Sequence, residues 1–188
     1  MNSFFDREEL ISLGLNSVGE NVMISRKASI YGASNIAIGN NVRIDDFCIL
    51  SGKITIKDNI HIAAYSALYG SDVGIVVEDF ANISSRVCIY AVSDDYSGNT
   101  MTNPTIPDKY KNLEKAPTRI GKHVIVGTGS TILPGVNLND GTAVGAMSLI
   151  KKSTESWKIY AGIPAKIIAE RSKKLIELEE VFLRDEQL

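Results

Sequence analysis

The sequence contains only two histidines, two cysteines and one tryptophan among its 188 residues. His61 and His123 are too few for a zinc site that needs three histidines. Cys48 and Cys88 match no metal-binding or redox spacing and are too few for a disulfide scaffold, so we expect reduced thiols. A strong charge of one sign is also lacking, because 22 acidic residues against 20 basic ones leave a net charge of -2. This balance disfavours a nucleic-acid or membrane-surface partner.

Long hydrophobic runs are missing as well. The longest aliphatic stretches, such as residues 75–77 and 124–126, are far below the roughly 18 to 20 apolar residues of a membrane span. Charged residues near the N-terminus interrupt any signal-peptide core, as at Asp6, Arg7, Glu8 and Glu9. We therefore expect no membrane span and a cytoplasmic location.

Aliphatic residues recur at every sixth position along most of the chain. The longest register contains Ile120, Val126, Ile132, Leu138, Val144 and Ile150. Four positions after such a residue stands another small or β-branched one, as at Cys48, Ser66, Val87, Ser130 and Thr142. We expect both sets to point inward. A period of six fits neither a helix nor an alternating hairpin strand, and predicts short strands joined by tight corners, with about 18 residues per triangular coil.

The repeat predicts an all-β fold, a parallel β-helix within one domain over residues 1–188, whose ends need caps. We expect an N-terminal cap over residues 1–16, coils over 17–94 and 119–155, and a C-terminal cap and helix over 156–188. Helical patterns run from Phe4 to Leu15 and from Ile167 to Leu183, and the second helix is expected to dock. We interpret short register shifts near 36–38, 50–56 and 68–77 as corner loops. Residues 95–118 are too long and proline-rich for a passive connection, which predicts an active-site loop.

Two segments carry a family resemblance. IGKHVIVGTGSTILPGVNLNDGTAVGAMSLIKKS, followed by IYAGIPAKII, resembles the left-handed β-helix acyltransferases with hexapeptide repeats. VCIYAVSDDYSG and TNPTIPDKY resemble a surface-polysaccharide subgroup, which contains sugar O-acetyltransferases and N-acyltransferases of dTDP-linked 4-amino-4,6-dideoxy sugars. The resemblance implies left-handed coils, although right-handed crossovers between parallel strands prevail in about 98% of cases. It also implies homotrimers with active sites between subunits, an acyl-CoA co-substrate, a nucleotide-linked sugar acceptor and no metal.

The resemblance also assigns positions for coenzyme A. Small residues and backbone N–H groups in the last coils would hold the pantetheine arm and thioester, at Gly127, Thr128, Gly145 and Ala146. Basic residues would meet the CoA phosphates, at Lys151, Lys152 and Lys166. Lysine serves that purpose as a mobile point charge. The alternative is that these lysines are only solvated charges at the end of the solenoid.

Asp94 stands where many relatives carry a histidine that removes a proton from an acceptor hydroxyl. Histidine has a reference pKa of about 6.5, whereas an aspartate near 3.9 is a weak base. A neutral amine is already a good nucleophile, and a carboxylate can hold its ammonium form and stabilise the positive charge that grows during attack. The substitution therefore favours N-acylation of an amino-dideoxy sugar, in surface-polysaccharide (O-antigen) biosynthesis, over O-acetylation of a sugar hydroxyl.

Other candidates carry weaker signals. Ser84 follows an inward residue at a corner, so its hydroxyl would reach the acyl group or bond its own backbone. The weak candidates for substrate binding are Asn82, Tyr90, Arg43 and Asp46. His61 and His123 fall at outward positions, and Trp157 packs against the terminal helix or lines the CoA groove.

Two rival classes fit less well. A non-catalytic solenoid would not require the long proline-bearing loop or the AGIPAKII segment. Calcium-binding β-rolls need a glycine-rich nonapeptide that is absent.

Overall fold

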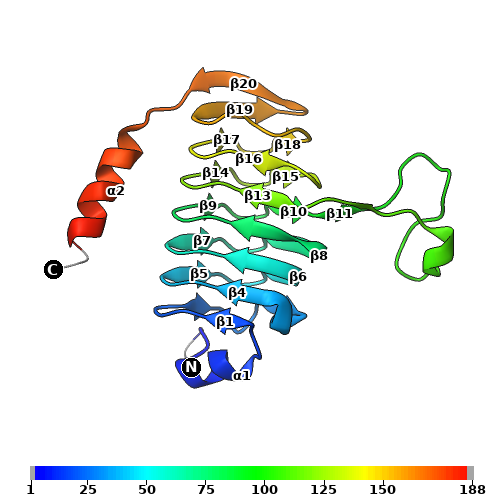
Figure 1. Ribbon diagram of the computed structural model, residues 1–188, viewed down its shortest axis with the longest axis horizontal. Coiled ribbons are helices and arrows are strands. Elements are labelled where there is room, and N and C mark those ends of the chain that lie inside the picture. Colours follow the sequence, from blue (N-terminus) through cyan, green and yellow to red (C-terminus); the bar gives the residue numbers. More distant parts are fainter. Residues whose placement is uncertain (1–2, 186–188) are drawn as a thin grey trace.

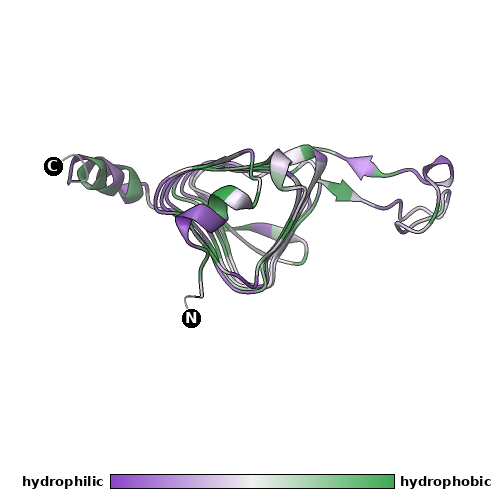
Figure 2. Ribbon diagram, turned by 90° about the horizontal axis from the view of Figure 1, so that it is seen from below, coloured by the Kyte–Doolittle hydropathy of each residue, from purple (hydrophilic) through white to green (hydrophobic). Residues whose placement is uncertain are grey.

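The computed structural model describes residues 3–185 and shows stacked coils that form a triangular prism (Figures 1 and 2). Two parallel sheets build its three faces. We call the face formed by the eight-stranded sheet face A. Its strands are β2 (Met23–Ile24), β5 (Val42–Ile44), β7 (Ile60–Ile62), β9 (Asn82–Ile83), β14 (Ile125–Val126), β17 (Ala143–Val144), β19 (Lys158–Gly162) and β20 (Ala165–Glu170).

The ten-stranded sheet folds over the other two faces, because its longest strands, β6 (Ile49–Ile56) and β8 (Ala67–Val77), bend around a corner. Face B contains their first halves with β3 (Ser29–Tyr31), β10 (Cys88–Tyr90), β15 (Thr131–Ile132) and β18 (Leu149–Ile150). Face C contains their second halves with β1 (Ser17–Val18), β4 (Ile36–Ile38), β13 (Thr118–Ile120) and β16 (Asn137–Leu138).

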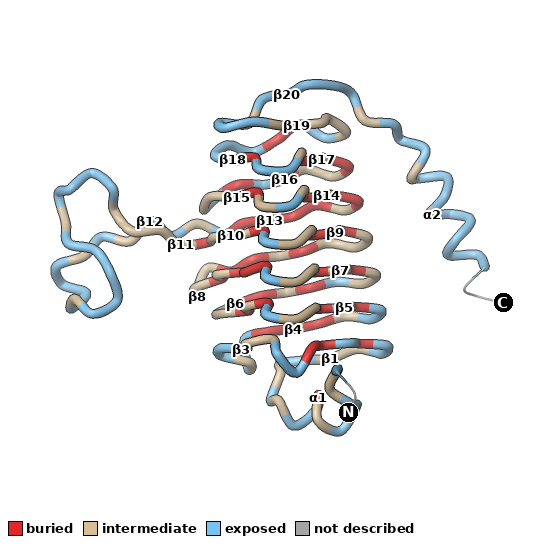
Figure 3. Tube along the Cα trace, turned by 180° about the vertical axis from the view of Figure 1, so that it is seen from behind, coloured by how far each residue is buried: buried red, intermediate tan, exposed pale blue. Residues whose placement is uncertain are grey.

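The sixfold aliphatic register forms the core, as the sequence predicts. Ile24, Ile44, Ile62 and Ile83 are completely buried and stack from coil to coil in face A. The second inward set is buried too, and its polar members bond neighbouring carbonyls; Ser66 Oγ, for example, donates to the Ser84 carbonyl at 2.9 Å. Figure 3 shows buried positions recurring in the stacked coils, whereas β20 at the C-terminal end is exposed along most of its length. Each coil thus buries its apolar side chains against the coils on either side.

Two of the predicted corner loops are absent. Residues 50–56 and 68–77 continue as β6 and β8, whose pairing shifts register at Gly52 instead of opening into loops. Gly52 takes φ +85°, and a Cβ atom on Gly70 would lie 2.1 Å from the Lys53 carbonyl oxygen, so both glycines let two backbones approach closely. Near residues 36–38 the chain forms a short 3-10 helix, Ala33–Asn35, before β4.

The N-terminal cap is a short helix, α1 (Arg7–Ser12), which begins inside the predicted pattern. Asp6 and Glu9 form a capping box, in which the Asp6 side chain accepts from the Glu9 N–H and the Glu9 side chain accepts from the Asp6 N–H. Leu10 is buried against the first coil. The helix therefore covers the open end of the core.

The C-terminal helix is shorter than predicted, because Ile167 and Ile168 belong to strand β20. This strand pairs antiparallel with β19, so it satisfies the backbone groups that the last coil would otherwise expose. Helix α2 (Lys174–Asp185) follows and runs back along the prism (Figures 1 and 3). It docks through one side only: the Phe182 ring meets the Phe80 ring edge-on at 5.9 Å, and no described residue of α2 is buried.

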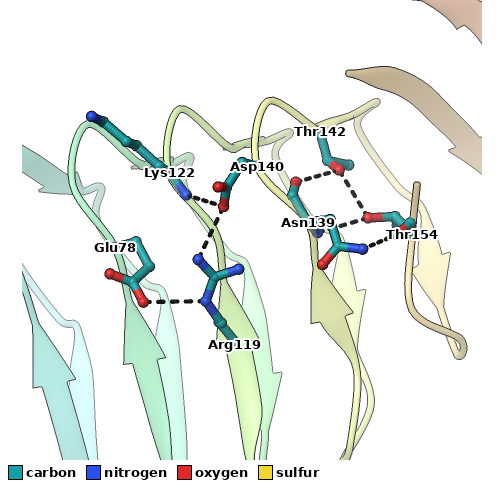
Figure 4. A network of polar contacts seen from close by, with 7 residues as sticks. All are labelled: Glu78, Arg119, Lys122, Asn139, Asp140, Thr142 and Thr154. Carbon is teal, nitrogen blue, oxygen red and sulfur yellow. Dashed lines mark hydrogen bonds and ion pairs between the residues drawn. The ribbon is translucent and has the colours of Figure 1, made fainter. Parts of the chain in front are cut away.

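The corner between faces C and A is held by polar side chains (Figure 4). Arg119 bonds Glu78 at 3.1 Å and Asp140 at 3.0 Å, and Asp140 also accepts from the Lys122 N–H at 3.0 Å. Because these residues come from three consecutive coils, the network fixes the stacking at this corner.

Candidate active site

Ser84, Gly127 and Gly145 form a row along the corner between faces A and B. Their amides bond the coil above, from Ser84 to the Val126 carbonyl at 3.0 Å and from Gly127 to the Val144 carbonyl at 2.8 Å. Sequence positions 43 and 18 residues apart therefore lie at the same corner in successive coils. The structure brings together a candidate catalytic residue and two candidate CoA positions.

The Ser84 hydroxyl is free to meet a ligand. Its backbone is fixed on both sides, by Val126 and by the Ser66 hydroxyl. Within residues 3–185 its Oγ has no hydrogen-bond partner, so the alternative in which Ser84 bonds its own backbone does not hold. A half-buried hydroxyl without an intramolecular partner is available to a substrate.

Gly127 and Gly145 differ in the space that the next coil leaves for a side chain. A Cβ atom on Gly127 would lie 2.5 Å from the Ala146 nitrogen, in the next coil. A Cβ atom on Gly145 would meet only the Ala161 Cβ closely, at 3.1 Å. Coil stacking alone therefore requires the first glycine and tolerates a side chain at the second.

Thr128 and Ala146 follow these glycines and are exposed. In the described part of the chain, the amide N–H groups of both residues lack an acceptor. Two such donors, one coil apart along a corner, suit the carbonyl groups of an extended arm such as pantetheine.

Lys151, Lys152 and Lys166 line one cavity of about 430 Å³ at the C-terminal end of the prism, together with Tyr160 and Pro164. Lys166 comes from β20 and the other two follow β18, so the terminal hairpin brings them together. Across residues 3–185, none of the three ammonium groups pairs with an acid. This unneutralised cluster suits a polyanion such as the phosphates of CoA.

Asp94 lies in a second and larger groove of about 820 Å³ on face B, lined also by Tyr69, Tyr90, Tyr96 and Pro134. Its carboxylate accepts a hydrogen bond from the Asn103 N–H at 3.3 Å, inside the predicted loop. Burial, and then the neighbouring Cys88, raise the pKa of Tyr90 to about 12, so this phenol stays neutral. The Tyr90 ring stacks on Tyr69 at 5.1 Å rather than standing alone.

A small hairpin holds Asp94 at the groove. Strand β11 (Val92–Ser93) directly precedes it and pairs with β12 (Glu114–Lys115), and a 3-10 helix, Asp108–Tyr110, lies farther out in the loop. Lys115 Nζ reaches Asp72 of β8 at 3.0 Å and lowers the pKa of that carboxyl to about 2. The loop is therefore anchored at its base, and it extends away from the prism (Figures 1 and 2).

Three predicted contacts lie apart from these grooves. Asn82 is on face A, in an apolar groove of about 370 Å³ under α2. Arg43 bonds Asp45 at 2.7 Å, and Asp46 bonds Lys27 at 2.8 Å. Although burial opposes it, hydrogen bonds from His61 and Arg43 hold the pKa of Asp45 below its usual range.

His123 is not outward, contrary to the prediction. It is only 9% exposed, stacks on Phe80 at 5.2 Å and bonds Glu179 of α2 at 2.8 Å. Trp157 lies on the same corner, 6.3 Å from His123, and covers Gly141. The His123 ring therefore belongs to the docking surface of α2, which only the return of the chain along the prism creates, and Trp157 lies beside that ring.

Sequence reasoning missed Tyr69 and Arg86. Tyr69 stands at an outward position of the repeat, one coil from Tyr90. Arg86 follows Ser84 by two residues at the same corner and is exposed. Counting outward positions along the sixfold register would have indicated both.

Two negative findings concern residues 3–185. No group of three His, Cys, Asp or Glu side chains in this range is placed to hold a metal ion. No helix in it is long and apolar enough to cross a membrane.

A stacked-coil prism with an anchored loop, a lysine-lined cavity and a corner row of small residues defines a class of enzyme, the hexapeptide-repeat acyltransferases. No known family model matches the chain. The dTDP-4-amino-4,6-dideoxy-D-glucose acyltransferase of Escherichia coli is 54% identical over 183 residues, which cover 96% of this chain and 95% of that protein. A probable lipopolysaccharide O-acetyltransferase of Escherichia coli K12, WbbJ, is 32% identical over 77% of this chain and 74% of its own length.

Solved structures agree with this class. AntD, an N-acyltransferase from Bacillus cereus in complex with dTDP and 3-hydroxybutyryl-CoA, superposes with a TM-score of 0.98 at 55% identity, covering 100% of both chains. An AntD variant in complex with dTDP-4-amino-4,6-dideoxyglucose and coenzyme A gives 0.97 at 56% identity, covering 98% of this chain and 100% of that chain. The chain belongs to the left-handed β-helix family of acyl-CoA-dependent acyltransferases.

Proposed function

We propose that this protein transfers an acyl group from acyl-CoA to the 4-amino group of a dTDP-linked 4-amino-4,6-dideoxy sugar. The observation that carries the proposal is Asp94, a carboxylate at the mouth of a groove of about 820 Å³. The names of the Escherichia coli acyltransferase and of the N-acyltransferase AntD support it. The AntD structures also include variants at an aspartate and a serine that carry the same numbers as Asp94 and Ser84.

The reaction needs one amine and one thioester. The Asp94 carboxylate holds the ammonium form of the acceptor and orients it. This group releases one proton to solvent, and the neutral amine then attacks the thioester. The nitrogen lone pair forms the C–N bond, the C–S bond breaks, and the sulfur leaves with its electron pair. The second proton leaves nitrogen and ends on the CoA thiolate, so the products are an amide and free CoA.

Ser84 and the backbone N–H groups of Thr128 and Ala146, along the same corner, position the thioester. The free Ser84 hydroxyl and the Thr128 and Ala146 N–H groups are donors for carbonyl oxygens, including the one that gains negative charge during attack. The lysine cavity holds the phosphates at the C-terminal end. This order of groups extends the CoA along the prism, with its reactive end near Ser84.

We infer that three chains form the working unit, with each active site between neighbours. Ser84 and Asp94 lie at opposite edges of face B within one chain, and both grooves open at its surface. A neighbouring prism beside face B would close the site around both substrates. Light scattering after size-exclusion chromatography should give three times the 20.4 kDa chain mass.

A cytoplasmic location and a role in surface-polysaccharide (O-antigen) biosynthesis belong to the same proposal. An enzyme that consumes acyl-CoA and a nucleotide sugar needs both substrates in its compartment. The name of WbbJ, which refers to lipopolysaccharide biosynthesis, supports the role.

The test offers acetyl-CoA or 3-hydroxybutyryl-CoA with dTDP-4-amino-4,6-dideoxyglucose, and scores the amide product by mass spectrometry. Asp94→Asn should lower kcat/KM by at least about 100-fold, the scale expected for loss of a charged catalytic contact. Asp108→Asn is the matched control, since that side chain is in the same loop and 97% exposed. Acylation of sugar hydroxyls without any amide product would refute the proposal and support O-acetylation instead.

A further inference from the structure

The loop after β11 begins with two adjacent carboxylates in different surroundings. Asp95 is satisfied within the loop, because it accepts hydrogen bonds from the Ser97 N–H at 2.8 Å and from the Thr100 hydroxyl at 2.9 Å. Asp94 lines the groove on face B, and in the described part of the chain its carboxylate accepts one hydrogen bond, from the Asn103 N–H at 3.3 Å. Its second oxygen is therefore open to a ligand.

Asn103 presents this N–H from a left-handed turn. It is the one non-glycine residue of the loop, residues 95–118, with a positive φ, at 73°. Its side-chain oxygen accepts from the Thr105 N–H at 2.9 Å and from the Thr105 hydroxyl at 2.6 Å, and its carbonyl accepts from the Ile106 N–H at 3.4 Å. Asparagine tolerates this backbone because its short amide bonds the chain two residues on. The turn therefore depends on this side chain.

The turn is tied to the returning arm of the loop. Two residues before Asn103, the Met101 N–H donates to the Tyr110 carbonyl at 2.9 Å. Beside this bond the Lys111 side chain, only 9% exposed, pairs with Asp108 at 3.0 Å. Left-handed backbone at a side-chain-bearing residue persists where its surroundings fix it, and such positions cluster at active sites. These contacts hold the turn, and the N–H that faces the carboxylate, in one place.

Orientation matters for this carboxylate because its two oxygens have different partners. The Asp94 Oδ1 atom accepts from the Asn103 N–H, which leaves Oδ2 for the ammonium group of the acceptor. An N–H that donates to a carboxylate makes a charge-assisted bond and favours one side-chain rotamer. The same turn places Pro104 against the groove. A displacement of about 1 Å at a reacting group can lower a rate by about 100-fold, so a small change in the turn should reach the chemistry.

Resting on the proposed function, we infer that Asn103 is a positioning residue for Asp94. Its left-handed turn directs a backbone N–H to one carboxylate oxygen and leaves the other to bind the acceptor amine. Thr105 supports the turn through its N–H and its hydroxyl. Asn103 acts through Asp94 and touches no reacting atom itself.

The test measures amide formation from dTDP-4-amino-4,6-dideoxyglucose and the acyl-CoA that the wild-type protein uses. Asn103→Ala removes the side-chain oxygen and disfavours the left-handed backbone, so kcat should fall by about 10-fold. The KM for acyl-CoA should stay within about twofold, because no group that holds the donor changes. The matched control is Asn99→Ala, since this asparagine is exposed in the same loop and its side chain has no partner within residues 3–185.

A double-mutant cycle separates positioning from a purely structural role. If Asn103 acts through Asp94, adding Asn103→Ala to Asp94→Asn should change kcat/KM by less than about twofold. A further loss of about 10-fold in that background would overturn the inference. An unchanged kcat in the single Asn103→Ala variant would overturn it as well.

A second variant covers the case in which Asn103→Ala lowers Tm. Thr105→Val removes only the hydroxyl that donates to the Asn103 side chain, and kcat should then fall by about 3-fold. An unchanged kcat in Thr105→Val would in that case contradict the inference. Absence of any amide product from the wild-type protein would overturn the proposed function itself.

Discussion

Alanine substitutions at Gly127 and Gly145 should separate coil stacking from ligand contact. At Gly127 the added Cβ atom would meet three backbone atoms of the next coil, at 2.5, 2.8 and 2.8 Å. These atoms cannot rotate away, so the coils must move apart locally. At Gly145 the one contact shorter than 3.5 Å is with the Ala161 side chain, at 3.1 Å. Neither glycine has a positive φ, so alanine adds no backbone strain at either site.

The magnitudes follow from these contacts. Overpacking commonly costs about 1 to 3 kcal/mol, and a clash with rigid backbone places Gly127→Ala near about 3 kcal/mol. Gly145→Ala should cost less than about 1 kcal/mol, partly offset by the lower entropy of the unfolded chain. For a chain of this size, each kcal/mol shifts Tm by about 2 to 4 °C. We expect Tm to fall by about 6 to 12 °C for Gly127→Ala and by under about 4 °C for Gly145→Ala.

The assay is thermal unfolding followed by circular dichroism, at one protein concentration because assembly shifts Tm. CoA affinity is measured on the same samples. A Gly127→Ala protein that melts within about 2 °C of wild type but loses CoA affinity would refute the stacking argument. It would show that the ligand, rather than the next coil, requires the glycine.

Three further predictions concern the core, α2 and the thiols. Ile83→Ala, at a completely buried position, should lower the free energy of unfolding by about 2 to 5 kcal/mol in urea titrations, and a loss below about 1 would contradict the packing. Although burial opposes it, Lys122 and His123 hold the pKa of Glu179 below its ordinary 4.5. The docking of α2 that this carboxylate supports is therefore present above pH 4.5 and is lost as the pH falls through the lower pKa of the folded state. The fluorescence of Trp157 should change over that lower pH range. The Glu179→Gln protein should show no such change. Burial raises the pKa of the Cys48 thiol, so in a Cys88→Ser protein, which lacks the half-buried second thiol, Cys48 should react with a disulfide reagent at pH 8 only after unfolding, and reaction of that native protein would contradict the burial of Cys48.

Asp94 and Ser84 show which parts of the candidate site could be predicted from the sequence. Asp94 was found because it stands in a histidine position beside an interrupted repeat, and the structure places it in a groove. Ser84 carried no such signal, since a corner serine commonly bonds its own backbone. Only the tertiary structure shows that its hydroxyl has no partner within residues 3–185.

The C-terminal segment shows where periodicity misleads. Ile167 and Ile168 fit the apolar stripe of a helix, yet they pair with β19 as a strand. Local pattern cannot decide between the two, because the free edge of the last coil is a tertiary feature that favours a strand there. For the same reason His123 counts as outward in the repeat, and becomes buried only when α2 returns over it.

The sequence by itself determined the prism, its inward residues and its interruption by a loop, because a sixfold repeat places apolar side chains without reference to distant segments. Tertiary structure decided which distant residues share a site. In the folded chain, Ser84 stacks with Gly127 and Gly145, Lys151 and Lys166 line one cavity, and Asn82 lies on another face. These neighbours arise from the rise and closure of coils, which depend on the whole chain folding at once.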